Sequence, residues 1–160
     1  MSLSCEVITR LKSKTLSTAE SLTGGGIGAA LTAVPGSSAV YKGGIISYTN
    51  EIKQKLLGVS QVSLEHYGAV SPWVAGEMVR GVRKLMNTDI AISVTGLAGP
   101  GGDEFGRPVG TVFIGYEDSQ RSVVEPHCFE GDRESIRNQT IKAALELILK
   151  YNSKKTIEVH

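Results

Sequence analysis

The residues of this chain that could do chemistry begin with Ser21, which stands just before the glycine run Gly24-Gly25-Gly26. A helix is predicted to follow at once, over residues 27–34. Glycines at a strand-to-helix turn let backbone N–H groups approach a ligand, and a helix start carries a partial positive charge. The stretch therefore predicts a site for an anionic or electron-rich ligand beside the Ser21 hydroxyl. A tight turn packed against a neighbouring element explains the glycines equally well.

Two cations, Lys53 and Arg133, are each predicted in the first turn of a helix, where the helix dipole disfavours positive charge. A partly buried lysine at such a place has a lowered pKa, so its neutral amine can act as a base. An arginine stays protonated, and its planar fork suits phosphate. We therefore expect Lys53 as a base and Arg133 as an anion clamp, with solvated side chains as the alternative for each.

Three further polar residues stand near the ends of predicted elements. Tyr48 precedes the helix of Lys53 and could relay or orient a proton, although a tyrosine at a strand end more often packs. Thr95 ends a predicted strand, where ligands of α/β sheets collect. Ser38 lies in a small polar turn and could donate to a phosphate.

Length and charge indicate one globular domain over residues 1–160, because the chain is 41% hydrophobic with a net charge of +1. Neither nucleic acid nor an anionic membrane is expected as a partner. Cys5 and Cys128 match no metal or redox motif, which favours free thiols. No stretch is apolar enough for a membrane span, and residues 1–14 lack the apolar run of a signal peptide. We expect a cytoplasmic protein.

The order of predicted elements favours a three-layer α/β/α domain with a mixed sheet, because early strands alternate with helices and a hairpin comes late. Strands are predicted over residues 15–21, 40–49, 90–94, 109–116 and 122–129. Helices are predicted over residues 3–13, 27–34, 50–58, 63–67, 71–86 and from 132 onward. We expect buried side chains at Ile46, Leu56 and Leu85, and a frayed tail over residues 154–160.

A dinucleotide cofactor is the first alternative. Gly24, Gly26 and Ala29 match the pattern G-x-G-x-x-A after a strand, but the acidic residue expected after the next strand is missing. A serine–tyrosine–lysine trio also resembles the short-chain dehydrogenases. In that family three residues separate the tyrosine from the lysine, whereas four separate Tyr48 from Lys53. A nicotinamide-dependent oxidoreductase is therefore the minor hypothesis.

Blocks of sequence in series resemble the CinA C-terminal domain, the nicotinamide-nucleotide amidase family. In chain order the matching blocks are Thr18–Gly25, Gly36–Ser38, Gly43–Asn50 with Lys53 and Leu57–Val59, Gly68–Ser71, Thr95–Gly102 with Pro108–Val112, and Phe129–Arg133 with Arg137. They cover nearly the whole chain. Leu22 stands where family members often carry cysteine, and we expect little effect because that residue does not react.

The resemblance implies hydrolysis of the carboxamide of nicotinamide mononucleotide, which gives nicotinate mononucleotide and ammonia. It implies Ser21 as nucleophile, Lys53 as general base and Tyr48 as the group that assists proton transfer, with no cofactor. Residues implied to hold the nucleotide or shape its pocket are Gly24, Gly25, Ser38, Thr95, Gly96 and Arg133. Many relatives carry an N-terminal domain that resembles molybdopterin-binding proteins; we expect neither this domain nor its activity here.

The residues support the same chemistry. The three histidines have no metal-ligand spacing, so no metal is expected, and a serine with a neutral lysine is the arrangement left for amide hydrolysis. The amides of Gly24 and Gly25 are then expected to be free for the substrate carbonyl. A nucleotide-binding or partner-binding module that has lost catalysis is the rival hypothesis. The sequence leaves the oligomeric state open, and a homo-oligomer is compatible with it.

Overall fold

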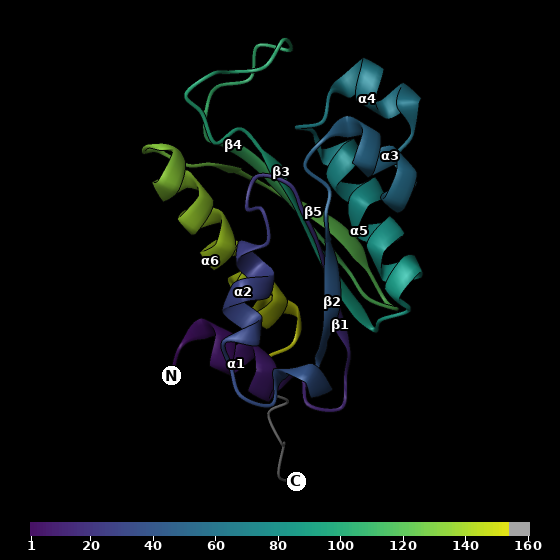
Figure 1. The fold of residues 1–160 in the computed structure, drawn as a ribbon, viewed down its shortest axis with the longest axis vertical. Helices are drawn as coiled ribbons and strands as arrows, with labels where there is room; N and C mark the ends of the chain where they lie inside the picture. The colour runs from purple at the N-terminus through teal and green to yellow at the C-terminus, as the bar shows by residue number, and fades with distance from the viewer. Residues whose placement is uncertain (154–160) are drawn as a thin grey trace, which may run out of the picture.

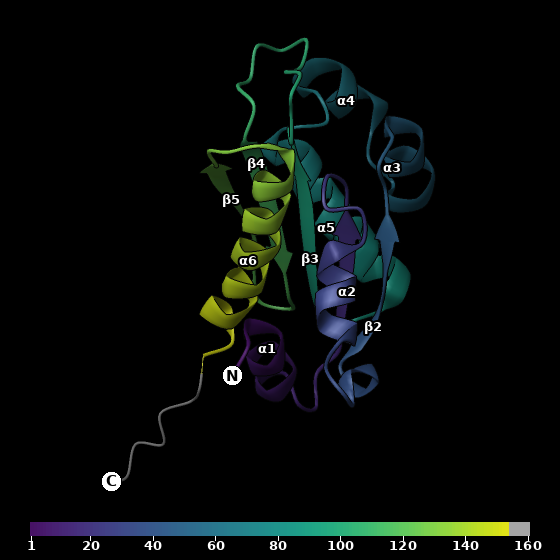
Figure 2. The same ribbon diagram turned by 60° about the vertical axis from the view of Figure 1, so that its left-hand side comes forward.

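The computed structural model describes residues 1–153 of the chain. Within them, one five-stranded sheet has the strand order β2-β1-β3-β4-β5. The strands are β1 (Leu16–Glu20), β2 (Tyr41–Ile46), β3 (Ile90–Gly96), β4 (Thr111–Glu117) and β5 (Ser122–Cys128). Strands β1, β2 and β3 run parallel to one another, and β4 runs antiparallel to its neighbours β3 and β5. The sheet is therefore mixed, as predicted. The carboxyl ends of β1, β2 and β3 therefore meet at one edge, at the top of Figure 2.

Helices cover both faces of this sheet (Figures 1 and 2). One face carries α1 (Leu3–Arg10), α2 (Gly26–Thr32) and α6 (Arg133–Tyr151). The other carries α3 (Asn50–Leu57), α4 (Gln61–Tyr67) and α5 (Pro72–Met86). Two apolar cores result, one on each face of the sheet. This arrangement confirms the predicted three-layer α/β/α architecture.

Helix starts follow the capping residues of the sequence. Ser71 Oγ accepts the N–H of Val74 in front of α5, and the Asp132 carboxylate accepts the N–H of Ser135 in front of α6. Both starts were predicted. For α3 the cap is Thr49, whose Oγ1 accepts the N–H of Ile52, rather than the expected Asn50. The side chain of Asn50 is thereby left without a capping role.

The prediction of a buried side chain is wrong at three positions, because Ile46, Leu56 and Leu85 are all exposed. The buried side chains of α3 are Lys53 and Leu57 instead. Burial of a lysine requires polar partners for its amine, and those partners are found at the candidate site below. The predicted frayed tail lies outside the described residues.

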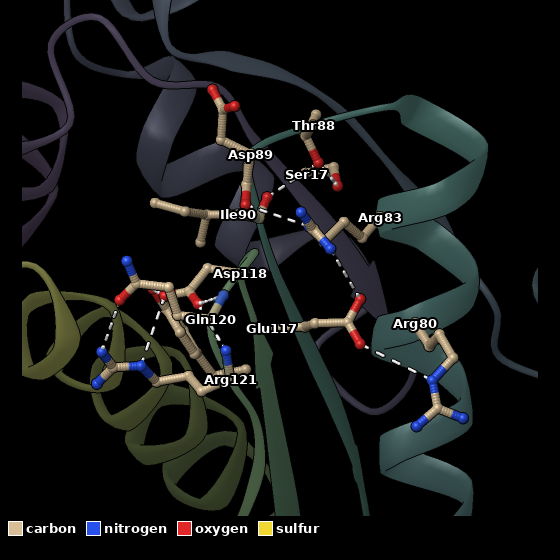
Figure 3. A network of polar contacts seen from close by, with 11 residues as sticks. Ser17, Arg80, Arg83, Thr88, Asp89, Ile90, Glu117, Asp118, Gln120 and Arg121 are labelled. Carbon is tan, nitrogen blue, oxygen red and sulfur yellow. Dashed lines mark hydrogen bonds and ion pairs between the residues drawn. The ribbon is translucent and has the colours of Figure 1, made fainter.

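A polar network ties α5 to the sheet at the end away from the carboxyl ends of the parallel strands (Figure 3). The Glu117 carboxylate, at the end of β4, lies 3.8 Å from Arg80 Nε and 3.6 Å from Arg83 Nη1. Arg83 Nε also donates to the carbonyl of Asp89, just before β3. Glu117 pairs with Ala91 at the start of β3. These contacts therefore hold the C-terminal half of α5 against the sheet.

Candidate active site

A cavity of about 310 Å³ lies at the carboxyl ends of the parallel strands, within the size range of small-molecule sites. Ligands of open α/β sheets bind at this edge. The lining residues come from the loops after β1 and β2, from α3, from the connection between α4 and α5, from the end of β3 with the loop after it, and from the start of α6. They are Ser21, Leu22, Tyr48, Asn50, Lys53, Ala69, Val70, Thr95, Gly96, Leu97, Ala98, Gly99, Gly101 and Arg133. A larger hollow of about 520 Å³ lies between β5 and α6, but it contains no serine, cysteine or buried lysine. The chemistry therefore points to the smaller cavity.

The centre of the cavity is a contact between Lys53 and Ser21. Lys53 Nζ lies 2.9 Å from Ser21 Oγ, 2.7 Å from the carbonyl oxygen of Ser47 and 3.3 Å from that of Tyr48. The two carbonyls accept two N–H bonds of the amine. A neutral amine held in this way directs its lone pair at the Ser21 hydroxyl, which is the geometry of a base beside its nucleophile.

The environment of Lys53 favours that neutral form. Its side chain is 1% exposed. Burial lowers the pKa of Lys53 from 10.5 to about 8, because an ammonium ion loses its hydration in the interior. A lysine with this pKa supplies a useful fraction of neutral amine near pH 7.

Arg133 and Tyr48 meet at the rim of the cavity. Arg133 Nη2 donates to the Tyr48 hydroxyl at 3.2 Å, and Nη1 donates to the carbonyl of Gly99 at 2.7 Å. The tyrosine contacts the Lys53 amine through its backbone carbonyl, while its hydroxyl faces the arginine. Arginine has five N–H donors, so donors are left for an anion.

The start of α2 is already occupied by an anion of the chain itself. Glu20 Oε1 accepts from Thr23 Oγ1 at 2.6 Å and from the N–H of Ile27 at 2.8 Å, and Oε2 accepts from the N–H of Gly28 at 3.1 Å. The expectation that this helix start binds an external anion is therefore wrong.

Gly24 and Gly25 allow the backbone to make the turn and do not contact the cavity. Gly24 and Gly25 have φ of 56° and 100°, which side-chain-bearing residues rarely adopt. The N–H of Gly24 donates to the carbonyl of Ser21 at 3.1 Å, so it is not free for a substrate. Neither glycine lines the cavity. The expected role of the Gly24 amide at the substrate carbonyl is therefore also wrong.

Ser38 is the one proposed nucleotide-binding side chain that lies at the other end of the sheet. It belongs to a short 3-10 turn, Ser37–Ala39, just before β2 begins. The start of β2 pairs with the start of β1, at Leu16, whereas the cavity lies beyond the end of β1. The structure does not bring Ser38 to the cavity.

Thr95, predicted from its place at the end of a strand, lines the cavity, and so does Gly96, which only the resemblance implied. The Thr95 hydroxyl donates to the carbonyl of Ala69 at 2.8 Å and so holds the neighbouring wall. Asn50 also lines the cavity, although only a helix-capping role was predicted for it. The loop after β3, which rises above this edge in Figure 1, supplies the remaining wall.

Two absences apply to residues 1–153. No helix there has the length and apolar character needed to cross a lipid bilayer. No group of three potential metal-ligating side chains comes together there either.

Comparison with known proteins decides the family. The family model of the CinA C-terminal domain matches residues 2–152. The chain belongs to this family. A CinA-like protein of Rippkaea orientalis is 47% identical over 142 residues, which are 87% of this chain and 34% of that protein. A putative competence-damage inducible protein of Acetivibrio thermocellus is 47% identical over 137 residues, which are 86% of this chain and 33% of that protein. The chain spans about a third of the length of these relatives.

Solved structures of the CinA family share the whole fold. The competence damage-inducible protein A (ComA) of Klebsiella pneumoniae superposes with a TM-score of 0.92 at 35% identity, over 96% of this chain and 97% of that one. The competence/damage inducible protein CihA of Agrobacterium tumefaciens gives a TM-score of 0.91 at 37% identity, over 94% of each chain. The names of these proteins refer to competence and damage and specify no reaction, so the chemistry must be argued from the site.

Proposed function

We propose that this CinA-family domain is an amidase that hydrolyses nicotinamide mononucleotide to nicotinate mononucleotide and ammonia. The observation that carries the proposal is the contact of 2.9 Å between Lys53 Nζ and Ser21 Oγ, with the amine oriented by two carbonyls. A serine and a neutral lysine supply nucleophile and base without a histidine or a metal ion.

The reaction proceeds through an ester of Ser21. Ser21 Oγ attacks the carboxamide carbon while Lys53 Nζ takes the hydroxyl proton. The tetrahedral intermediate collapses, the C–N bond breaks, and Lys53 returns the proton to the leaving ammonia. Water then attacks the ester and gives its proton to Lys53, and the acid leaves as Ser21 regains its hydrogen.

Arg133 is the proposed contact for the phosphate of the mononucleotide. Replacing Arg133 by methionine should raise KM for the mononucleotide about 10- to 100-fold, because a charge-assisted hydrogen bond is lost. Arg133→Lys keeps the positive charge but not the planar fork, so its KM should lie between those of the unmodified protein and Arg133→Met. Steady-state kinetics with the riboside, which has no phosphate, is the control. A KM that rises equally for the riboside would contradict this assignment.

The function is tested by ammonia release from the mononucleotide, the riboside and free nicotinamide side by side. The mononucleotide should be preferred. Ser21→Ala should lower its turnover at least about 10³-fold with the fold preserved, because the attacking oxygen is gone. Ser119→Ala, in the exposed turn between β4 and β5, is the matched control and should be fully active.

Three results would contradict parts of this proposal. Full activity of folded Ser21→Ala would refute the serine mechanism. Binding of the mononucleotide by the unmodified protein without ammonia release would favour the non-catalytic binding module. Loss of activity on adding a chelator would contradict the metal-free mechanism.

A further inference from the structure

The loop that carries Ser21, residues 21–25, is held on its two sides by charged side chains that the mechanism does not use. Glu20 precedes the loop in β1, and Arg137 reaches it from the second turn of α6. One side chain accepts hydrogen bonds and the other donates them. The catalytic consequence drawn from this arrangement rests on the proposed function.

Glu20 satisfies the donors of the loop and of the helix behind it. Its residue is 2% exposed, and its two oxygens accept from the Thr23 hydroxyl and from the N–H groups of Ile27 and Gly28. A buried carboxylate is tolerated where hydrogen bonds and a helix N-terminus compensate its charge. Glu20 thereby fixes α2 to the end of the strand that leads into Ser21.

Arg137 satisfies the acceptors of the same loop. Its Nε donates to the carbonyl of Leu22 at 2.9 Å, and its Nη2 donates to the carbonyl of Thr23 at 3.3 Å. A peptide unit is planar, so fixing its carbonyl also fixes the N–H on the opposite side. One guanidinium group therefore sets the Leu22–Thr23 and Thr23–Gly24 peptide planes, which directly follow the plane that carries the Leu22 N–H.

Two further backbone hydrogen bonds hold Ser21 itself. The N–H of Ser21 donates to the carbonyl of Val94 at 3.2 Å, and the carbonyl of Ser21 accepts from Gly24 at 3.1 Å. Within residues 1–153 the N–H groups of Leu22, Thr23 and Gly25 have no acceptor, and of these three residues only Leu22 lines the cavity. The amide after a nucleophilic serine is one donor of the oxyanion hole in α/β-hydrolases.

We propose that Glu20 and Arg137 are positioning residues that clamp the nucleophile loop, keeping Ser21 Oγ against Lys53 Nζ and the Leu22 N–H available to the attacked carbonyl. They touch neither the cavity nor the reacting atoms. Their loss should therefore lower the reactivity of Ser21 while leaving substrate affinity nearly unchanged.

The experiment measures the reactivity of Ser21 separately from turnover. A fluorophosphonate probe forms a bond between phosphorus and Ser21 Oγ as the P–F bond breaks, fluoride leaves and Lys53 takes the hydroxyl proton. The labelling rate of folded protein is compared for the unmodified chain, Glu20→Gln, Arg137→Met and Arg137→Lys. Lys142→Met, an exposed charge on the same helix as Arg137, is the matched control. Kinetics of ammonia release and thermal unfolding are measured on the same samples.

We expect Arg137→Met and Glu20→Gln to lower both labelling rate and kcat about 10- to 100-fold, since small misplacements of a reacting group have this effect. KM should change less than about twofold, because neither side chain contacts the substrate. Arg137→Lys, with a single donating head, should recover part of the loss, and Lys142→Met should match the unmodified protein.

Other outcomes separate this proposal from the proposed function. Labelling at the unmodified rate in folded Glu20→Gln and Arg137→Met would overturn the clamp, as would a loss confined to KM. Labelling that falls in both variants while the unmodified protein releases no ammonia would support the clamp and refute the amidase. Absence of labelling in the unmodified protein would overturn both.

Discussion

Lys53→Met should lower kcat/KM for nicotinamide mononucleotide about 10²- to 10⁴-fold, the contribution of a positioned general base. Lys53 is 1% exposed, and methionine has an unbranched apolar side chain that keeps this buried space filled. Only the amine that faces Ser21 Oγ is removed. Affinity for the nucleotide should persist, since the anion contact assigned to Arg133 is untouched. The measurement combines ammonia release with equilibrium binding.

The ionisation of the Lys53 amine should appear in the pH dependence of activity of the unmodified protein. A base works when neutral, so the activity of a lysine with a pKa of about 8 rises as pH rises through 8 and is constant above it. An exposed lysine would move this limb to a pH above 10. The profile of kcat/KM between pH 6 and pH 10 reports the ionisation in the free protein.

Lys55→Met is the matched control for this prediction. Lys55 lies on the same helix as Lys53, two residues further on, and its side chain is exposed. Its replacement should change neither the rate nor the profile. An unaltered rate in Lys53→Met, or activity that falls with rising pH between 7 and 9, would show that Lys53 is not the base.

The fold could be predicted wherever local signals determine it. Ser71 and Asp132 begin helices because a side-chain oxygen accepts a nearby N–H, a contact within three residues of the chain. Burial was harder to predict, because apolar spacing does not reveal which face of a short helix meets the sheet. In α3 the apolar Leu56 is exposed and the charged Lys53 is buried, the reverse of what hydropathy indicates.

The two residues proposed to react could be predicted from the sequence, but the groups that hold them in place could not. Ser21 and Lys53 were identified from residue type and position, and the structure brings them together. The carbonyls that orient the lysine belong to the backbone and leave no mark in the sequence. Arg137 acts on a loop 115 residues earlier in the chain, and only the folded arrangement reveals that contact.

The role of Glu20 depends on its burial, which its residue type does not reveal. A carboxylate inside a strand whose five residues are all buried needs partners, and a glycine-rich helix start follows it directly. Together these two features explain why Glu20 caps α2 from inside the protein and leaves no open anion site there.

Gly81→Ala should be strongly destabilising, because α3 and α5 touch backbone to backbone at this residue. A Cβ added to Gly81 would overlap the carbonyl oxygen of Leu57, the last residue of α3. Separating the two helices should cost about 3 kcal/mol, the upper range for overpacking. It should also draw Lys53, one turn earlier on α3, away from Ser21 Oγ. Urea unfolding and ammonia release measure the two effects.

Gly76→Ala is the matched control on the same helix and should have the opposite sign. The nearest atom to its added Cβ is Val124 Cγ2 at 3.8 Å, an ordinary van der Waals contact. Alanine should therefore stabilise α5 by about 0.5–1 kcal/mol through helix propensity alone. If both variants unfold at the same urea concentration, the close approach at Gly81 does not hold α3. The orientation of Lys53 must then depend on the carbonyls of Ser47 and Tyr48 alone.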